Sequence, residues 1–80
     1  MSMGWTVNEL IAFFERRGIP RNAYSIYGDR DESFCLVREG SEWLVYYSER
    51  GRRNELGWGK SEAQGLDLLK LFVLESCKQL

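Results

Sequence analysis

The pattern around Gly40 and Ser41 constrains the fold of this 80-residue chain more than any other feature. Runs rich in aromatic and β-branched side chains lie on both sides of this pair, at residues 34–38 and 43–48. A two-residue connection that contains glycine is typical of a tight β-hairpin, because such turns require left-handed backbone conformations that glycine adopts readily. The segment therefore predicts two antiparallel strands joined at Gly40 and Ser41.

The same turn predicts the register of the hairpin. It places Val37 opposite Leu44 and Cys35 opposite Tyr46, with all four side chains on one face. Because side chains alternate between the two faces of a strand, the other face carries a bulkier and more apolar set. This set consists of Phe34, Leu36, Trp43, Val45 and Tyr47. We expect it to form the core beneath the helices, and we expect Tyr46 to lie on the face away from that core.

Two matches to the S/T-x-x-E/Q capping box predict a helix at each end of the chain. Thr6 and Glu9 form the first match, and Gly18 marks the end of the helix that they begin. Ser61 and Gln64 form the second match and begin the last helix. Apolar residues follow both matches at helical spacing, which supports the same prediction.

The remaining segments complete the expected architecture. Residues 24–27 predict a short strand, residues 51–54 a basic and flexible turn, and residues 56–59 a short fourth strand. The resulting order is α-β-β-β-(β)-α. It predicts a single small α+β domain over residues 1–80, in which an antiparallel meander is packed by the N- and C-terminal helices.

Three leucines of the last helix fall outside its main apolar face: Leu68, Leu71 and Leu74. Apolar surface left exposed on a monomer often marks an interface. We therefore expect this surface to be covered by a partner or by a second copy of the chain, which would make a homodimer through the C-terminal helix.

Composition limits the cellular compartments and the classes of partner that we expect for this protein. A net charge of −1 and a pI of about 5.4 give no general attraction to nucleic acid or to an anionic membrane surface. The sequence shows neither a signal-peptide pattern nor an apolar run long enough to span a bilayer. Cys35 and Cys77 form no CxxC motif, which favours two reduced thiols over a disulfide. We therefore expect a cytoplasmic protein without membrane contact.

Few residues are candidates for catalysis. The chain has no His, which removes the commonest general base and metal ligand. Cys35 lies in an apolar strand with no neighbouring cation to stabilise a thiolate. Asp29 and Asp31 could form a carboxylate dyad, but a solvated acidic loop is the simpler interpretation. We expect no catalytic residue, no metal site and no cofactor, and hence no enzymatic activity.

One resemblance favours nucleic acid as the partner. The element order and the Gly-Trp-Gly-Lys-Ser segment at residues 57–61 resemble the layout of double-stranded-RNA-binding domains. That family holds phosphates with a lysine cluster at the start of its final helix. Here Lys60 is the only cation near those positions, and Glu62 would repel phosphate. The other candidate cations form a small basic patch, for which a solvated turn is the simpler interpretation: Arg50, Arg52 and Arg53. A nucleic-acid-binding domain, or a regulatory interaction domain, is the alternative function.

A second resemblance covers most of the chain, from about Val7 to Leu74. Its most distinctive piece is Trp-x-Val-Tyr-Tyr-Ser-Glu-Arg-Gly at residues 43–51. Further matching residues are Phe34-Cys35-Leu36, Gly40 and Ser61-Glu62-Ala63. In these residues the chain resembles small bacterial immunity proteins of polymorphic toxin systems, including those of contact-dependent growth inhibition. The resemblance implies a cytoplasmic antidote that binds one cognate protein toxin and blocks its active site, without catalysis or a cofactor.

Charge and aromatic character indicate which residues would contact such a partner. The toxins are often nucleases with basic clefts, and the carboxylates of an inhibitor can imitate phosphate. The candidate carboxylates are Asp29, Asp31, Glu32 and Glu49. Tyr46 is the candidate aromatic anchor, with burial by another chain or strand as the alternative. Arg50 completes this edge, and a local salt bridge between Glu49 and Arg50 is the alternative interpretation of that pair.

Overall fold

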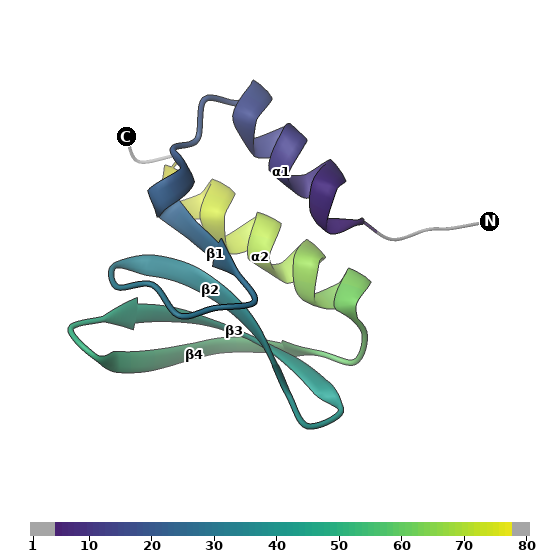
Figure 1. Cartoon of the computed structure of the whole chain (residues 1–80), viewed down its shortest axis with the longest axis vertical. Coiled ribbons are helices and arrows are strands. Elements are labelled where there is room, and N and C mark those ends of the chain that lie inside the picture. The colour runs from purple at the N-terminus through teal and green to yellow at the C-terminus, as the bar shows by residue number, and fades with distance from the viewer. Residues whose placement is uncertain (1–4, 78–80) are drawn as a thin grey trace.

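A computed structural model describes residues 5–77 of the chain. Two helices lie side by side on one face of a four-stranded sheet, whose strands follow the order β1-β2-β3-β4 (Figure 1). The elements are α1 (Val7–Arg16), the short 3₁₀ helix η1 (Arg21–Ala23), β1 (Tyr24–Ile26), β2 (Ser33–Glu39), β3 (Glu42–Glu49), β4 (Arg52–Gly59) and α2 (Glu62–Cys77). The predicted α+β class and the order of the main elements are confirmed.

Both helices begin at the predicted positions, with a complete capping box at α1 and, at α2, a Gln64 side chain that accepts from the Lys60 N–H at 2.8 Å instead of the Ser61 N–H. The Thr6 hydroxyl accepts a hydrogen bond from the Glu9 backbone N–H at 3.2 Å, and the Glu9 carboxylate accepts one from the Thr6 N–H at 3.0 Å. Gly18 follows α1 with a left-handed φ of 72°. At α2, the Ser61 hydroxyl accepts a hydrogen bond from the Gln64 N–H at 3.2 Å. These bonds satisfy backbone donors that a helix N-terminus otherwise leaves without partners.

The β2–β3 hairpin has the predicted register. Val37 lies opposite Leu44 and Cys35 opposite Tyr46, and Gly40 takes a left-handed φ of 66° in the turn. The helix-facing side of the hairpin contributes Leu36 and Val45 to the main core, where both are fully buried. The prediction of which face packs under the helices is therefore confirmed.

The expectation that every strand is antiparallel is wrong for β1. This strand pairs with β2 in parallel, with Tyr24 opposite Phe34 and Ile26 opposite Leu36. The reason lies in residues 27–32, which run back to the beginning of β2 instead of forming a hairpin (Figure 1). Tyr27 and Glu32 take left-handed φ values of 70° and 56°, so the chain changes direction sharply at both ends of this segment.

The basic segment after β3 is mostly strand and not a flexible turn. Only Arg50 and Gly51 form the turn, with left-handed φ values of 52° and 80°, and β4 begins at Arg52. Two consecutive residues with positive φ are typical of a type I′ hairpin, whose twist matches that of the flanking strands. The fourth strand is therefore eight residues long and pairs with β3 along its length, with one irregularity in register between Val45 and Tyr46.

Helix α2 packs more of its surface than expected. Leu68 and Leu74 are partly buried against the main core, and only Leu71 among the three leucines is largely exposed, at 51%. The apolar surface expected on this helix is therefore reduced to a single leucine. Self-association through α2 stays a prediction. Within residues 5–77, neither helix is long and apolar enough to cross a membrane.

Two glycines allow α2 to approach the sheet closely. A Cβ atom at Gly65 would lie 2.8 Å from the Leu36 Cδ1 atom and 3.0 Å from the Trp43 Cβ atom. A Cβ atom at Gly59 would lie 2.8 Å from the backbone nitrogen of Gly65. All three distances are shorter than van der Waals contact, so this spacing of helix and sheet requires residues without a side chain.

Replacing Gly65 by Ala is expected to lower the free energy of unfolding by about 1–2 kcal/mol, although alanine favours helix formation. The added methyl group would displace Leu36 and the strand at Trp43. Urea denaturation measures the effect. Gly57→Ala is the matched control, because its Cβ would meet Leu68 at an ordinary 3.5 Å, and we expect a change within about 0.5 kcal/mol. Equal stability of the two variants would contradict this account of the packing.

Candidate partner-binding site

Residues 27–32 form a loop that covers the sheet face opposite the helices. Both ends of the loop are bound to the sheet: the Tyr27 N–H donates to the Leu36 carbonyl at 2.8 Å, and the Glu32 N–H donates to the Ser48 carbonyl at 2.6 Å. Beneath the loop lies a second, smaller apolar cluster, formed by Cys35, Leu44, Tyr46 and Val37. We call residues 27–32 the covering loop.

Tyr46 is the centre of this second cluster. Its side chain is 0% exposed, and its hydroxyl donates a hydrogen bond to the Asp29 carboxylate at 2.6 Å. The guanidinium of Arg53 lies over the Tyr46 ring, 4.6 Å from its centre. Burial raises the pKa of Tyr46, and the hydrogen bond to Asp29 raises it further, so the hydroxyl stays a donor at neutral pH.

This burial does not fit the interpretation of Tyr46 as an exposed aromatic anchor. The residue lies on the face away from the main core, as expected, but the chain's own covering loop encloses it. A partner could reach Tyr46 only after the loop moved. Asp29 is exposed, but its carboxylate already accepts the hydrogen bond of this phenol.

Cys35 has a packing role in the same cluster. It is a free cysteine that is fully buried, and its thiol lies 3.6 Å from the Arg30 carbonyl, to which it donates. Burial raises the pKa of the thiol, which therefore stays protonated at neutral pH and is a poor nucleophile. The side chain of Cys77 lies outside the described part of the structure.

Asp31 connects the covering loop to the turn between β3 and β4. Its carboxylate accepts a hydrogen bond from the Arg50 backbone N–H at 2.7 Å. Arg50 is one of three non-glycine residues with positive φ in the described chain, and such backbone persists where the surroundings hold it in place. This bond therefore fixes the position of the turn relative to the loop.

Three of the candidate carboxylates meet at this end of the sheet. Asp31, Glu32 and Glu49 lie close enough to Tyr47 to affect its ionisation: burial is the main cause of its raised pKa, and the three carboxylates add to it. All three residues are exposed. An open hollow of about 460 Å³ adjoins Glu49, and Arg50 and Arg52 complete its lining. We call Asp31, Glu32 and Glu49 the acidic end.

Side chains within the acidic end differ in their internal partners. Asp31 is bonded to Arg50, whereas the Glu32 and Glu49 carboxylates form no hydrogen bond or ion pair within residues 5–77. The ion pairs in that part of the chain join Arg21 to Glu15 and Arg53 to Glu39. The alternative of a salt bridge between Glu49 and Arg50 is therefore wrong, and both glutamates are available to a partner.

Cations do not gather where a double-stranded-RNA-binding domain would need them. Lys60 follows the end of β4 that precedes α2, whereas Arg52 and Arg53 begin β4 at its opposite end. Arg53 is also held by Tyr46 and by Glu39 at 3.5 Å. A phosphate contact at the start of α2 would therefore depend on Lys60 beside Glu62. In residues 5–77 no three or more His, Cys, Asp or Glu side chains are arranged to hold a metal ion.

Comparison with known proteins gives no match: no family model, no curated protein and no solved structure is significantly similar to this chain. The fold and the site are therefore interpreted from the residues of this chain.

Sequence reasoning missed the bond between Tyr46 and Asp29. The two residues are 17 positions apart, and the pattern of the hairpin gives only the face on which Tyr46 lies. The one available signal was the tyrosine itself, because a buried phenol needs a hydrogen-bond partner and the adjacent loop is rich in carboxylates. The contacts of Arg53 with Tyr46 and Glu39 were likewise not predicted, because the sequence places Arg53 in a basic turn.

Replacing Tyr46 by Phe is expected to lower the free energy of unfolding at pH 7 by about 1–2 kcal/mol, because the bond to Asp29 is lost. The difference between variant and wild type should shrink above a pH of about 10, the usual pKa of an unfolded tyrosine. In this pH range the Tyr46 phenol ionises in the unfolded wild-type chain but stays protonated in the folded protein, because folding raises its pKa. The wild type therefore loses stability, whereas the variant has no phenol at this position and keeps its stability.

Urea denaturation at pH 7 and near pH 11 measures this difference. Tyr47→Phe is the control at pH 7, since the Tyr47 hydroxyl forms no hydrogen bond within the described residues, and its stability should be close to that of the wild type. A Tyr46→Phe difference that stays constant with pH would show that the phenol is not protected in the folded state.

Proposed function

We propose that this chain is a bacterial immunity protein that binds a cognate secreted toxin and blocks its active site with the acidic end of the sheet. The proposal combines two lines of support: the resemblance over residues 7–74, and the exposed acidic end. The single observation that carries it is the convergence of Glu32 and Glu49 at one surface, from segments far apart in the sequence, without internal partners. The function requires no catalysis and no cofactor.

The chemistry of the acidic end suits a basic cleft. Nuclease toxins bind phosphates with cations, and carboxylates at the surface of an inhibitor can occupy the same cations. The protein has a net charge of −1, so its charge is close to balanced overall and the local grouping of carboxylates provides the attraction. Such a grouping accelerates encounter with a positively charged partner, and salt weakens the effect.

The backbone of the acidic end is held in one arrangement. Asp31 binds the Arg50 N–H, and the Glu32 N–H binds the Ser48 carbonyl, so the loop and the turn are fixed to the sheet before any partner arrives. A preorganised surface loses less conformational entropy on binding. The proposed roles therefore divide: Glu32 and Glu49 contact the toxin, Asp31 positions them, and Asp29 and Tyr46 hold the loop.

Reversing the charge at both contact positions, Glu32→Lys with Glu49→Lys, is expected to slow association with the toxin about tenfold or more at low salt, with a smaller effect at high salt. Stopped-flow or surface-binding kinetics measure the rate, with the toxin encoded beside this gene as the partner. Cells that express this toxin should grow when wild-type protein is present and lose protection with the double variant.

Asp67→Lys is the matched control for each single reversal, Glu32→Lys or Glu49→Lys, because Asp67 is an exposed carboxylate on α2 and its reversal should leave association unchanged. Thermal unfolding confirms that each variant is folded. Full protection by a folded double variant would move the interface to another surface. Failure of the wild-type chain to protect against that toxin would refute the immunity function.

A further inference from the structure

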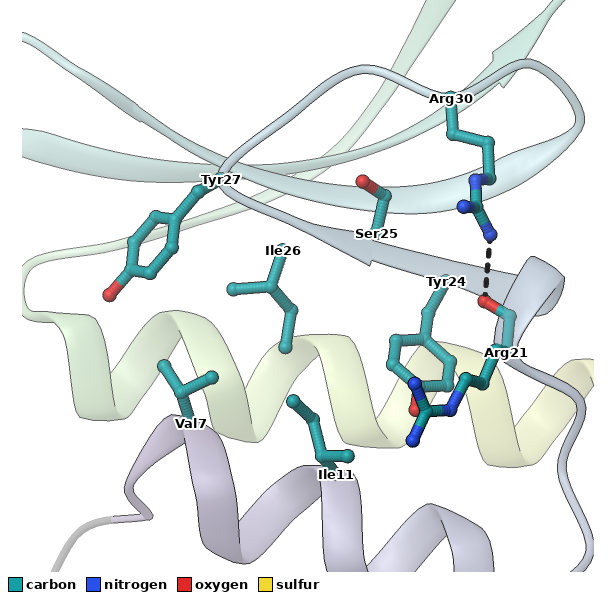
Figure 2. A pocket seen from close by; sticks show the side chains of 8 residues that line it. All are labelled: Val7, Ile11, Arg21, Tyr24, Ser25, Ile26, Tyr27 and Arg30. Carbon is teal, nitrogen blue, oxygen red and sulfur yellow. Dashed lines mark hydrogen bonds between the residues drawn. The ribbon is translucent and has the colours of Figure 1, made fainter.

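An apolar groove of about 370 Å³ lies between α1 and the edge strand β1 (Figure 2). Val7 and Ile11 of α1 point into it from one side and Ile26 of β1 from the other, with α2 behind them. Arg21, Tyr24 and Arg30 lie towards one end, and Tyr27, which is 56% exposed, stands at the other. This size is at the lower end of the range for ligand pockets, about 300–1,000 Å³, and suits a short segment.

Backbone groups of β1 border the same groove. Because β1 is the first strand in the sheet order, one of its sides has no neighbouring strand. The Tyr27 N–H bonds to β2, and alternate residues of a strand direct their backbone groups to opposite sides. The N–H and C=O of Ile26 therefore point away from β2, next to the apolar side chains of the groove. An edge of this kind can accept an additional strand.

β1 lacks two of the features that commonly protect an edge strand. Its residues, Tyr24, Ser25 and Ile26, include no charged side chain and no proline, and its length of three residues restricts an added strand to a short ladder. The side chains of Tyr24 and Ile26 face the helices, as do their partners Phe34 and Leu36. An added strand would direct alternate side chains to the same side, where Val7 and Ile11 line the groove.

The arginine end of the groove is suited to a carboxylate. One guanidinium nitrogen of Arg30 donates to the Arg21 carbonyl at 3.1 Å, which holds the side chain at the groove (Figure 2). Arg30 forms no ion pair within residues 5–77, and its other N–H groups can still donate. The Arg21 guanidinium is paired with Glu15, so Arg30 supplies the unneutralised charge. Bonds between a guanidinium and a carboxylate are among the stronger hydrogen bonds in proteins.

We propose that this groove binds an extended acidic peptide segment of a protein partner, which adds to β1 as a fifth strand. Backbone bonds to Ile26 hold the segment, apolar side chains enter between β1 and α1, and a carboxylate binds Arg30. The groove is a second binding surface in addition to the acidic end, and its charge selects a segment of opposite sign. Its test needs no toxin, so its failure and that of the immunity function are distinguishable.

Two synthetic peptides test both strand directions: acetyl-Thr-Val-Thr-Val-Asp-amide and its reverse, acetyl-Asp-Val-Thr-Val-Thr-amide. Each is titrated into the full-length protein at concentrations on the order of 1 mM, a range suited to weak binding. One of them should shift the backbone amide signals of Ile11 and Ile26 and slow hydrogen exchange at the Ile26 amide. A peptide with N-methylated backbone amides should bind at least about tenfold more weakly, because it cannot complete the strand pairing.

Arg30→Gln should weaken binding of the aspartate peptide about tenfold, and should leave binding of the matching asparagine peptide almost unchanged. Arg52→Gln is the control, since it removes the same charge from an exposed arginine outside the groove, and it should have no effect. The proposal is overturned if neither peptide shifts the groove signals, or if the N-methylated peptide binds equally well. Octanoate that reproduces the shifts without slowing exchange at Ile26 would also overturn it, by indicating a site for small carboxylates.

Discussion

The hydrogen bond from the Tyr46 hydroxyl to Asp29 holds the covering loop over the second face of the sheet, and much of the structure depends on it. Both helices pack on the other face, so Cys35 and Leu44 would meet water without the loop. A buried phenol without a partner costs about 1–3 kcal/mol, and the Asp29 carboxylate removes that cost. The loop can reach this position only by returning along the sheet, which leaves β1 parallel to β2.

One short loop thereby positions both proposed binding surfaces. Arg30 points to the groove beside β1, whereas Asp31 points to the turn at Arg50. These neighbours have opposite charges and act on opposite sides of the loop, so the protein presents a carboxylate surface and a guanidinium surface without a large net charge.

Local patterns predicted the parts of the fold that local interactions determine. The helix starts at Thr6 and Ser61 and the register around Gly40 follow from residues only a few positions apart, and the structure has them as predicted. The return of residues 27–32 was not predictable in this way, because a loop with three carboxylates has the composition of a solvated loop. The basic turn predicted at residues 51–54 lies one residue earlier, at Arg50 and Gly51, where the Arg50 N–H bonds to Asp31, 19 residues away.

The candidate site shows even more clearly that local sequence patterns do not predict contacts between distant residues. Sequence reasoning selected carboxylates near the end of β3 by charge alone, and charge does not distinguish a residue that contacts a partner from one that holds the protein together. Asp29 and Asp31 form bonds inside the protein, and Glu32 and Glu49 do not. In a domain this small, where a single core gives limited stability, exposed polar residues must also complete the fold. Substitution at Asp29 or Asp31 would therefore change stability and recognition together, and only the two glutamates can separate binding from folding.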